Sequence, residues 1–246
     1  MNVSATKHKK RTLVSLFTIA SFALCLIGLA GSSCAADKSP SDKAAAPKPA
    51  LKAAAAEPKA AWKSCFDGKT LSGWKITDFA GRGEVSVKNG TIILEMGQMT
   101  GITWTNDLPT MNYEISLEAM RVDGSDFFCG LTFPVGKDPC SLIIGGWGGG
   151  VVGLSSLDSQ DAANNETTRY VSFKSGQWYL IRLQVTEGKI DAWIDTDKVV
   201  DADTKDRTIG IRLEMEESKP LGIATYSTTA ALRNIKVREL PKQAEK

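Results

Sequence analysis

The sequence predicts an all-β fold, a two-sheet antiparallel β-sandwich of the jelly-roll kind, over residues 62–240. Apolar residues recur at every second position through this region, which is typical of strands that bury one face. Turn sequences such as Lys88-Asn-Gly90 and Glu187-Gly-Lys189 separate these segments. Because no segment carries a long apolar stripe of helical period, many short one-faced strands must pack as two sheets around one core.

The alternation is clearest in four segments. In Tyr179–Val185 every odd position is apolar, whereas Arg182 and Gln184 lie on the other face. The same pattern predicts half-buried strands at Tyr113–Arg121, Ile190–Ile194 and Ile209–Glu216. Shorter strands are predicted at Glu84–Lys88, Thr91–Glu95, Gly101–Trp104, Asp126–Phe133, Ser141–Trp147, Val151–Leu154, Ala224–Ser227 and Leu232–Leu240.

The first 36 residues have the order of a secretory signal peptide. A basic start (KHKKR) precedes the apolar run Leu13–Ala30, and small residues lead to a cleavage site after Ala36. This predicts an exported protein, periplasmic, extracellular or on the cell surface, with no membrane span after cleavage. One alternative is a retained membrane anchor, since this 18-residue run, interrupted only by Ser15, Thr18 and Ser21, is just long enough for a span. Another is a lipid anchor at Cys34, although Gly31 stands where a bacterial lipobox prefers Leu.

Residues 37–61 are predicted to be a disordered linker, and residues 241–246 a short tail. Ten of the 25 linker residues are Ala, five are Lys and four are Pro, so the segment has too little apolar area to fold alone. Residues 1–61 hold nine of the 30 basic residues but only three of the 28 acidic ones, which leaves the domain that follows with a net charge of −4. This charge argues against binding to nucleic acid.

The single histidine, His8, lies in the predicted signal peptide. A mature chain without histidine has no Ser-His-Asp or Cys-His relay and no imidazole ligand for zinc. Any general base must therefore be a carboxylate, a lysine, a tyrosine or the terminal amine.

Three cysteines remain after residue 36. Cys129 and Cys140 flank a predicted hairpin turn at Pro134–Pro139. They either form a disulfide in an oxidising compartment or are two buried thiols, and the sequence leaves both interpretations open. Cys65 is then a buried free thiol.

Ordered motifs give the domain a resemblance to a known family. The segment Cys65–Trp74 (CFDGKTLSGW) resembles the opening signature of the 3-keto-disaccharide hydrolase family, formerly a domain of unknown function. Weaker blocks follow in the same order as in that family, at Val87–Thr91, Tyr113–Arg121, Gly176–Tyr179 and Leu232–Leu240. The resemblance implies a concanavalin-like, laminin-G-like jelly roll that acts on carbohydrate.

The resemblance also implies a reaction, cleavage of glycosides already oxidised at C3. A 3-keto group acidifies the neighbouring C–H, so a carboxylate base and a charge stabiliser can expel the glycosidic oxygen. The chain departs from the family pattern at Phe128–Pro134, where Pro replaces an expected Arg, and at Leu142–Gly148, where expected acids are missing. The alternative is a non-catalytic glycan-binding or surface-interaction module on the same fold.

Candidate site residues follow from these two hypotheses. As an enzyme, the domain would draw its base and acid from four carboxylates, Glu118, Asp126, Glu214 and Glu216. For substrate binding we expect Arg121 and three tryptophans predicted to lie at the surface, Trp104, Trp147 and Trp193, while Trp62, Trp74 and Trp178 are predicted to lie in the core.

Two further segments carry alternative interpretations. The glycine-rich run Gly145–Gly150 indicates either a strand edge with a bulge or backbone exposed to a sugar beside Trp147. The acidic series from Asp195 to Asp206 indicates a polar turn, since it lacks the Gly and terminal Glu of an EF-hand loop. A divalent metal such as calcium at that series is the alternative, and the sequence leaves the cofactor unknown.

Overall fold

A computed structural model describes residues 60–242 of the 246-residue chain. The predicted signal peptide, the linker up to residue 59 and residues 243–246 lie outside the described residues. Within 60–242, no helix is both long enough and apolar enough to cross a bilayer.

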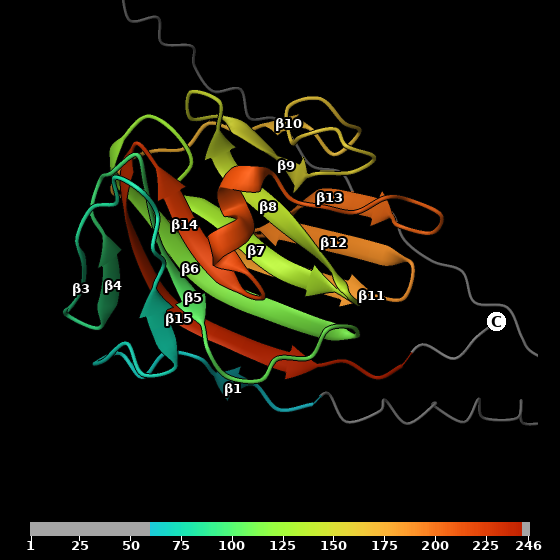
Figure 1. Ribbon diagram of the computed structural model, residues 1–246, viewed down its shortest axis with the longest axis horizontal. Helices are drawn as coiled ribbons and strands as arrows, with labels where there is room; N and C mark the ends of the chain where they lie inside the picture. The colour runs from blue at the N-terminus through green and yellow to red at the C-terminus, as the bar shows by residue number, and fades with distance from the viewer. Residues whose placement is uncertain (1–59, 243–246) are drawn as a thin grey trace, which may run out of the picture. The chain divides into compact units, whose positions relative to one another are not determined.

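Two antiparallel sheets face each other (Figure 1). The larger is eight-stranded, with the order β13-β12-β11-β6-β15-β4-β3 and β1 added beside β15. Its strands are β13 (Asp197–Asp203), β12 (Lys189–Ile194), β11 (Trp178–Thr186), β6 (Tyr113–Gly124), β15 (Thr228–Glu239), β4 (Thr91–Leu94), β3 (Val85–Lys88) and β1 (Lys63–Ser64).

The smaller sheet is seven-stranded, with the order β10-β9-β8-β7-β14-β5-β2. Its strands are β10 (Arg169–Tyr170), β9 (Val151–Ser155), β8 (Asp138–Gly146), β7 (Cys129–Val135), β14 (Gly222–Tyr226), β5 (Met99–Trp104) and β2 (Trp74–Ile76). A short 3₁₀ helix, η1 (Leu213–Ser218), lies in front of this sheet in Figure 1.

The core lies between the sheets and follows the period-two pattern of the sequence. On β6, Ile115 and Leu117 are fully buried, and on β7 Leu131 and Phe133 meet them from the other sheet in one continuous cluster. Burying a side chain of this size contributes roughly 1.5–3 kcal/mol. The prediction of an all-β, two-sheet antiparallel sandwich is confirmed.

The signature segment Cys65–Trp74 has a structural role. The Asp67 carboxylate accepts hydrogen bonds from the backbone N–H groups of Lys69 and Thr70, both at 2.7 Å, which closes a turn. The Trp74 indole N–H then donates to the Cys65 carbonyl at 2.7 Å, and its ring packs in the core. The motif therefore joins the first strands to the sandwich. None of its residues lines the cleft on the outer face of the seven-stranded sheet.

Two local predictions are wrong. Ile209–Glu216 does not form a strand, because from Leu213 onward the chain turns into η1 and crosses the outer face of the seven-stranded sheet, with Leu213 83% exposed. Asp197–Asp203, predicted to be a polar turn, forms the edge strand β13, whose apolar Val199 and Val200 are buried. The short strands β1, β2 and β10 carry too few residues to show a period.

The register of β7 against β8 settles the cysteine pairing. Cys129 lies opposite Ile144, whereas Cys140 lies opposite Phe133, so the two cysteines are four residues apart along the ladder. At about 3.3 Å per residue that is roughly 13 Å, about twice the Cα separation that a disulfide spans. Both thiols are free and buried, as is Cys65.

Candidate functional site

Most of the predicted site residues lie on the two outer faces of the sandwich, whereas Trp104 and Arg121 are buried. Asp126, Glu214 and Trp147 line one cleft on the outer face of the seven-stranded sheet. Glu118 lies on β6 and Trp193 on β12, both in the other sheet. Only the first group is therefore brought together.

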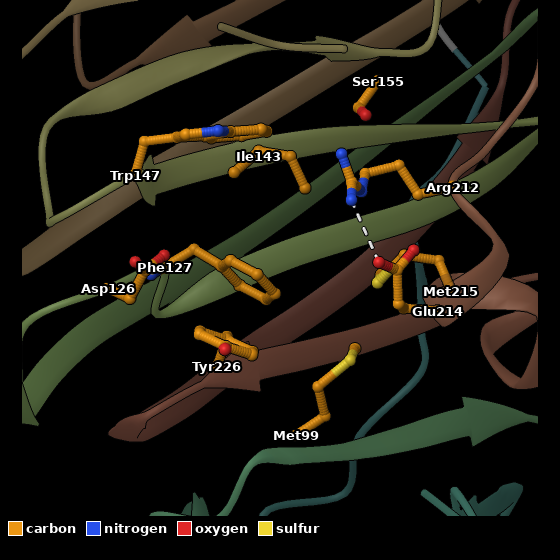
Figure 2. A pocket seen from close by; sticks show the side chains of 10 residues that line it. All are labelled: Met99, Asp126, Phe127, Ile143, Trp147, Ser155, Arg212, Glu214, Met215 and Tyr226. Carbon is orange, nitrogen blue, oxygen red and sulfur yellow. Dashed lines mark hydrogen bonds and ion pairs between the residues drawn. The ribbon is translucent and has the colours of Figure 1, made fainter.

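The cleft has a volume of about 310 Å³ and combines apolar walls with a few polar groups (Figure 2). It is formed where the outer face of the seven-stranded sheet meets η1 and the turns at the strand ends. Its lining residues are Met99, Asp126, Phe127, Ile143, Trp147, Ser155, Arg212, Glu214, Met215 and Tyr226.

Aromatic side chains form one end of the cleft. The Phe127 and Tyr226 rings stack with centroids 6.0 Å apart at 27°, and Trp147, 45% exposed, stands across from them (Figure 2). Ile143 lies between the aromatic end and Ser155. Flat aromatic faces over an apolar floor suit a ligand with an apolar face and a polar rim, such as a pyranose ring.

Trp147 occupies a turn to which the Asp126 carboxylate is bound by a hydrogen bond. Its own φ is +48°, in the left-handed region, and Gly148 and Gly149 follow with φ of +85° and +108°. The Asp126 carboxylate accepts from the N–H of Gly148 at 3.0 Å and from the N–H of Phe127 at 2.8 Å. Both oxygens of Asp126 thus hold backbone, so this predicted acid or base shapes the cleft wall.

Arg121 supports the same turn from beneath. Its side chain is buried, and the residue is 6% exposed. Nη2 lies within hydrogen-bonding distance of three carbonyl oxygens, those of Gly149 at 2.9 Å, Asp126 at 3.1 Å and Gly145 at 3.2 Å. Arg121, predicted to bind substrate, has its guanidinium enclosed by this backbone and lies outside the cleft lining.

The surroundings of Arg121 explain why glycines flank the turn. The guanidinium lies 5.1 Å from the Phe128 ring centre and 6.0 Å from that of Phe173. A Cβ on Gly145 would come within 2.6 Å of Nη2, so only glycine fits there. Burial lowers the pKa of the Arg121 guanidinium, which nevertheless stays charged at neutral pH.

The opposite end of the cleft is polar. Arg212 Nη2 donates to Glu214 Oε1 at 3.0 Å, and Nη1 donates to Asp161 Oδ2 at 3.1 Å. The hydrogen bond from Arg212 lowers the pKa of Glu214, which is therefore an ionised proton acceptor at neutral pH. Ser155 is only 1% exposed, and its hydroxyl has no hydrogen-bond partner among the described residues.

The remaining predicted carboxylates do not join this site. Glu118 Oε1 accepts from Asn234 at 2.6 Å and Oε2 from Arg233 Nε at 2.8 Å on the other sheet. Partial burial would raise the pKa of Glu118, but these hydrogen bonds outweigh it and the pKa is lowered. Glu216 lies on η1 and forms an ion pair with Lys219.

Two of the three tryptophans predicted to lie at the surface have other roles. Trp104 is 6% exposed and packs edge-on against Trp74 in the core, with ring centres 5.0 Å apart, so the surface prediction is wrong. Trp193 lies on the outer face of the eight-stranded sheet between Arg182, 4.6 Å from its ring centre, and Lys198, 5.7 Å from it. Trp147 alone of the three lines the aromatic cleft.

The acidic series near β13 is paired with lysines. Asp201 accepts from Lys189 at 2.7 Å and from Lys198 at 2.8 Å, and these hydrogen bonds lower its pKa to about 2. Within residues 60–242, no group of three His, Cys, Asp or Glu side chains is placed to hold a metal ion.

Strands β7 and β8, which hold the two segments that depart from the family pattern, form the floor beside the cleft. On β7 and β8 the outward positions carry small or apolar side chains, with Ile143 in the lining. The Thr132 and Ser141 hydroxyls hydrogen-bond to each other at 2.9 Å. Ionic groups come instead from the segment around η1, through Arg212 and Glu214.

Sequence reasoning missed seven lining residues that the fold brings together, Met99, Phe127, Ile143, Ser155, Arg212, Met215 and Tyr226. In the predicted strand Ala224–Ser227, alternation puts Tyr226 on the apolar face with Ala224 and so would place it in the core. For Arg212 the alternation of Ile209–Glu216 indicates only a solvent-facing position on a strand.

Comparisons with known proteins identify the domain at the level of family. A family model described as the 3-keto-alpha-glucoside-1,2-lyase-like domain matches residues 61–238. No curated protein matches the chain.

Several solved structures are similar to the chain at low sequence identity. A protein described as a glycosyl hydrolase, from Parabacteroides distasonis, is 14% identical, with a TM-score of 0.48 over 73% of this chain and 94% of its own. The carbohydrate-binding module CBM66 from Bacillus subtilis is 12% identical, with a TM-score of 0.47 over 68% and 96%. Domain 4 of AbnA, an extracellular arabinanase from Geobacillus stearothermophilus in complex with arabinotriose, is 14% identical, with a TM-score of 0.49 over 75% and 94%.

Proposed function

The chain belongs to the 3-keto-alpha-glucoside-1,2-lyase-like domain family, and from this premise we propose that it is a carbohydrate-active domain. Its sugar ligand would occupy the cleft on the outer face of the seven-stranded sheet. The observation that carries this proposal is the aromatic end of that cleft, where Trp147 stands exposed opposite the stacked Phe127 and Tyr226 (Figure 2).

The chemistry of the cleft fits a neutral sugar. A pyranose ring has C–H groups on its faces, which pack on aromatic rings, and hydroxyls at its rim, which need polar partners. The unpartnered Ser155 hydroxyl and the Arg212–Glu214 pair supply such partners at the far end of the cleft. Because both carboxylates of the lining already have backbone or arginine partners, the cleft does not require a charged ligand.

Binding of methyl α-D-glucopyranoside and its C3-oxidised form, measured by calorimetry, tests the proposal. Trp147→Ala should weaken binding by about fivefold, since a lost aromatic contact costs on the order of 1 kcal/mol. Trp193→Ala is the matched control on the other sheet and should leave the affinity unchanged. Equal effects of the two substitutions, or no binding of either sugar, would contradict the assignment of the cleft.

A second candidate function is catalysis by elimination, and the pairing of Arg212 with Glu214 favours it. The ionised Glu214 carboxylate would take the proton from C2 of a 3-keto-glycoside, while Arg212 stabilises the negative charge that develops on the keto oxygen. The electron pair then forms the C1–C2 double bond as the C1–O bond to the leaving group breaks. Water would protonate the departing oxygen.

Release of the leaving group from p-nitrophenyl 3-keto-α-glucoside tests this candidate. Glu214→Gln removes the base and should lower kcat by 100-fold or more, in the range typical of a general base. Glu118→Gln, the same change on the other sheet, should leave kcat as it was. If the wild-type protein binds the sugar without releasing the leaving group, the domain is a glycan-binding module.

We also propose that the domain acts outside the cytoplasm. The support is the order of basic start, apolar run and small residues in residues 1–36. Mass spectrometry of the N-terminus of the protein from its native cells tests this, and a mature chain that begins at residue 37 is expected. A cytoplasmic protein that keeps residues 1–36 would contradict it.

A further inference from the structure

Arg212, at the polar end of the cleft, has a carboxylate on each of two sides. Its Nη2 donates to Glu214 Oε1 at 3.0 Å, and its Nη1 donates to Asp161 Oδ2 at 3.1 Å. Glu214 lies two residues further along the same segment, whereas Asp161 comes from the loop between β9 and β10. Of these two partners, Asp161 is therefore the one that ties the guanidinium to another part of the fold.

The two ion pairs differ in their exposure to solvent. The Arg212 and Glu214 side chains are 46% and 55% exposed, and an ion pair between two exposed side chains contributes little. The Asp161 side chain is only 19% exposed. The pair with Glu214 alone would leave both side chains free to change rotamer, since so weak a contact does not offset the entropy of fixing them.

Hydrogen bonds within the loop fix the Asp161 carboxylate. Its Oδ1 accepts from the Asn164 side-chain amide at 2.7 Å and from the backbone N–H of Ala163 at 3.1 Å. Ala162, next to Asp161, is fully buried. One oxygen of Asp161 thus holds its own loop, which leaves Oδ2 for Arg212.

The loop is in turn tied to the seven-stranded sheet. The Asn165 side-chain nitrogen lies 2.8 Å from the carbonyl oxygen of Leu154 on β9. The same nitrogen lies 2.8 Å from the carbonyl oxygen of Asp161 and 3.1 Å from that of Gln160. A chain of contacts therefore runs from the sheet through Asn165 and Asp161 to Arg212.

We propose that Asp161 is a positioning residue, which holds Arg212, and through it Glu214, at the polar end of the cleft. This inference rests on the proposed function, because that end is where the ligand would find its polar partners. A guanidinium held at both Nη1 and Nη2 has a fixed plane, so its remaining N–H groups keep one direction. In Figure 2 the guanidinium lies between Glu214 and Ser155. Asp161 itself does not line the cleft.

Loss of the Asp161 charge affects Glu214 in opposite directions under a positioning role and under a purely electrostatic one. The charged side chains that line the cleft, or the pocket that adjoins it at Arg212, are Asp126, Asp161, Arg212 and Glu214. Removing one negative charge from this group would by itself lower the pKa of Glu214 further. When Arg212 instead loses its fixed position, its hydrogen bond to Glu214 weakens and the pKa rises toward the ordinary 4.5.

Titration of Glu214 by carboxyl ¹³C NMR, on the full chain without ligand, tests the inference. Asp161→Asn should raise the pKa of Glu214 toward 4.5. Asn164→Ala keeps the carboxylate but removes its nearer donor, and should raise this pKa by less. Asp158→Asn is the matched control, because Asp158 is another carboxylate of the same loop, paired with Arg207 at 2.6 Å outside the cleft lining. It should leave the pKa of Glu214 unchanged.

Calorimetry with methyl α-D-glucopyranoside gives a second readout. Asp161→Asn should weaken binding by about fivefold, which corresponds to one net hydrogen bond that has lost its fixed donor. In an Arg212→Met background the same substitution should cause little further loss.

A pKa of Glu214 that stays unchanged or falls in Asp161→Asn would overturn the positioning role, and so would additive losses of affinity. Either result would leave the aromatic cleft in place as the sugar site. If the wild-type protein binds no sugar, the proposed function is wrong, and the titration of Glu214 alone decides whether Asp161 positions Arg212.

Discussion

The guanidinium of Arg121 lies 2.9 Å from the carbonyl oxygen of Gly149, two residues beyond the exposed Trp147. A buried arginine is costly unless its N–H groups find partners. Arg121 finds them in backbone carbonyls of the cleft wall, although its Nε has no partner among the described residues. We infer that this residue positions Trp147 and does not touch the ligand itself.

Arg121→Met should therefore weaken sugar binding through Trp147. The substitution keeps the apolar stem but removes the donors, so the turn that carries Trp147 loses its fixed position and affinity should fall by about tenfold. In a Trp147→Ala background the same substitution should cause little further loss. Isothermal titration of the four proteins of this double-mutant cycle measures the coupling.

Arg233→Met, which removes another arginine that lies over a tryptophan, Trp178 on the other sheet, is the control. Additive losses from Arg121→Met and Trp147→Ala would contradict the positioning role. Such a result would mean that Arg121 acts on the fold as a whole.

Glu118→Gln should destabilise the domain without changing its action on sugar. The amide has no charge and only one acceptor oxygen, so it keeps the hydrogen bond from Asn234 or the one from Arg233 but not both. Because the pair is partly exposed to solvent, a loss of about 0.5–1 kcal/mol in the free energy of unfolding is expected. Urea unfolding measures this effect. A loss of sugar affinity at unchanged stability would place Glu118 in a binding site after all.

Stability should fall as the pH drops below about 4.5. Glu118, Glu166 and Glu214 have pKa values below the ordinary 4.5, so each carboxylate favours the folded state above that pH and loses this contribution as the pH falls through its lower folded value. The Tm measured from pH 7 to pH 3 should decline most steeply at the acid end. Glu118→Gln should flatten the decline, and a Tm that rises on acidification would contradict the lowered pKa values.

All three cysteines of the domain should stay reduced under oxidising conditions. Burial raises the pKa of the Cys129 and Cys140 thiols to about 12, and the register of their strands keeps them apart. Alkylation followed by mass spectrometry should modify none of the three in the native domain and all three after denaturation. A disulfide between Cys129 and Cys140 would require a different register of β7 on β8.

Much of the fold can be predicted from sequence because the alternation of apolar and polar residues in each strand shows which face is buried. In β11 the alternation of Ile181, Leu183 and Val185 with polar residues follows directly from the side that faces the core. Asn89-Gly90 is equally local, since both residues adopt the positive φ that their two-residue turn requires. Such signals depend only on neighbours in the chain.

The site could be predicted only in part, because its residues come from segments far apart in the sequence. The alternating run Ile209–Glu216 has the pattern of a strand, but its backbone pairs with the Ser156–Leu157 segment only at Ile209 and Gly210, and Met215 packs on the outer face of the sheet as η1. Arg212 and Glu214 therefore reach the cleft through tertiary packing. Trp104 shows the converse, since alternation does not distinguish a core tryptophan from an exposed one.

The most direct measurement of the central claim is a crystal structure of the protein with methyl 3-keto-α-D-glucoside. Electron density for the ring is expected against Trp147, with hydroxyls or the keto oxygen directed toward Ser155 and Arg212. Density on the outer face of the eight-stranded sheet beside Trp193, with an empty aromatic cleft, would contradict the account.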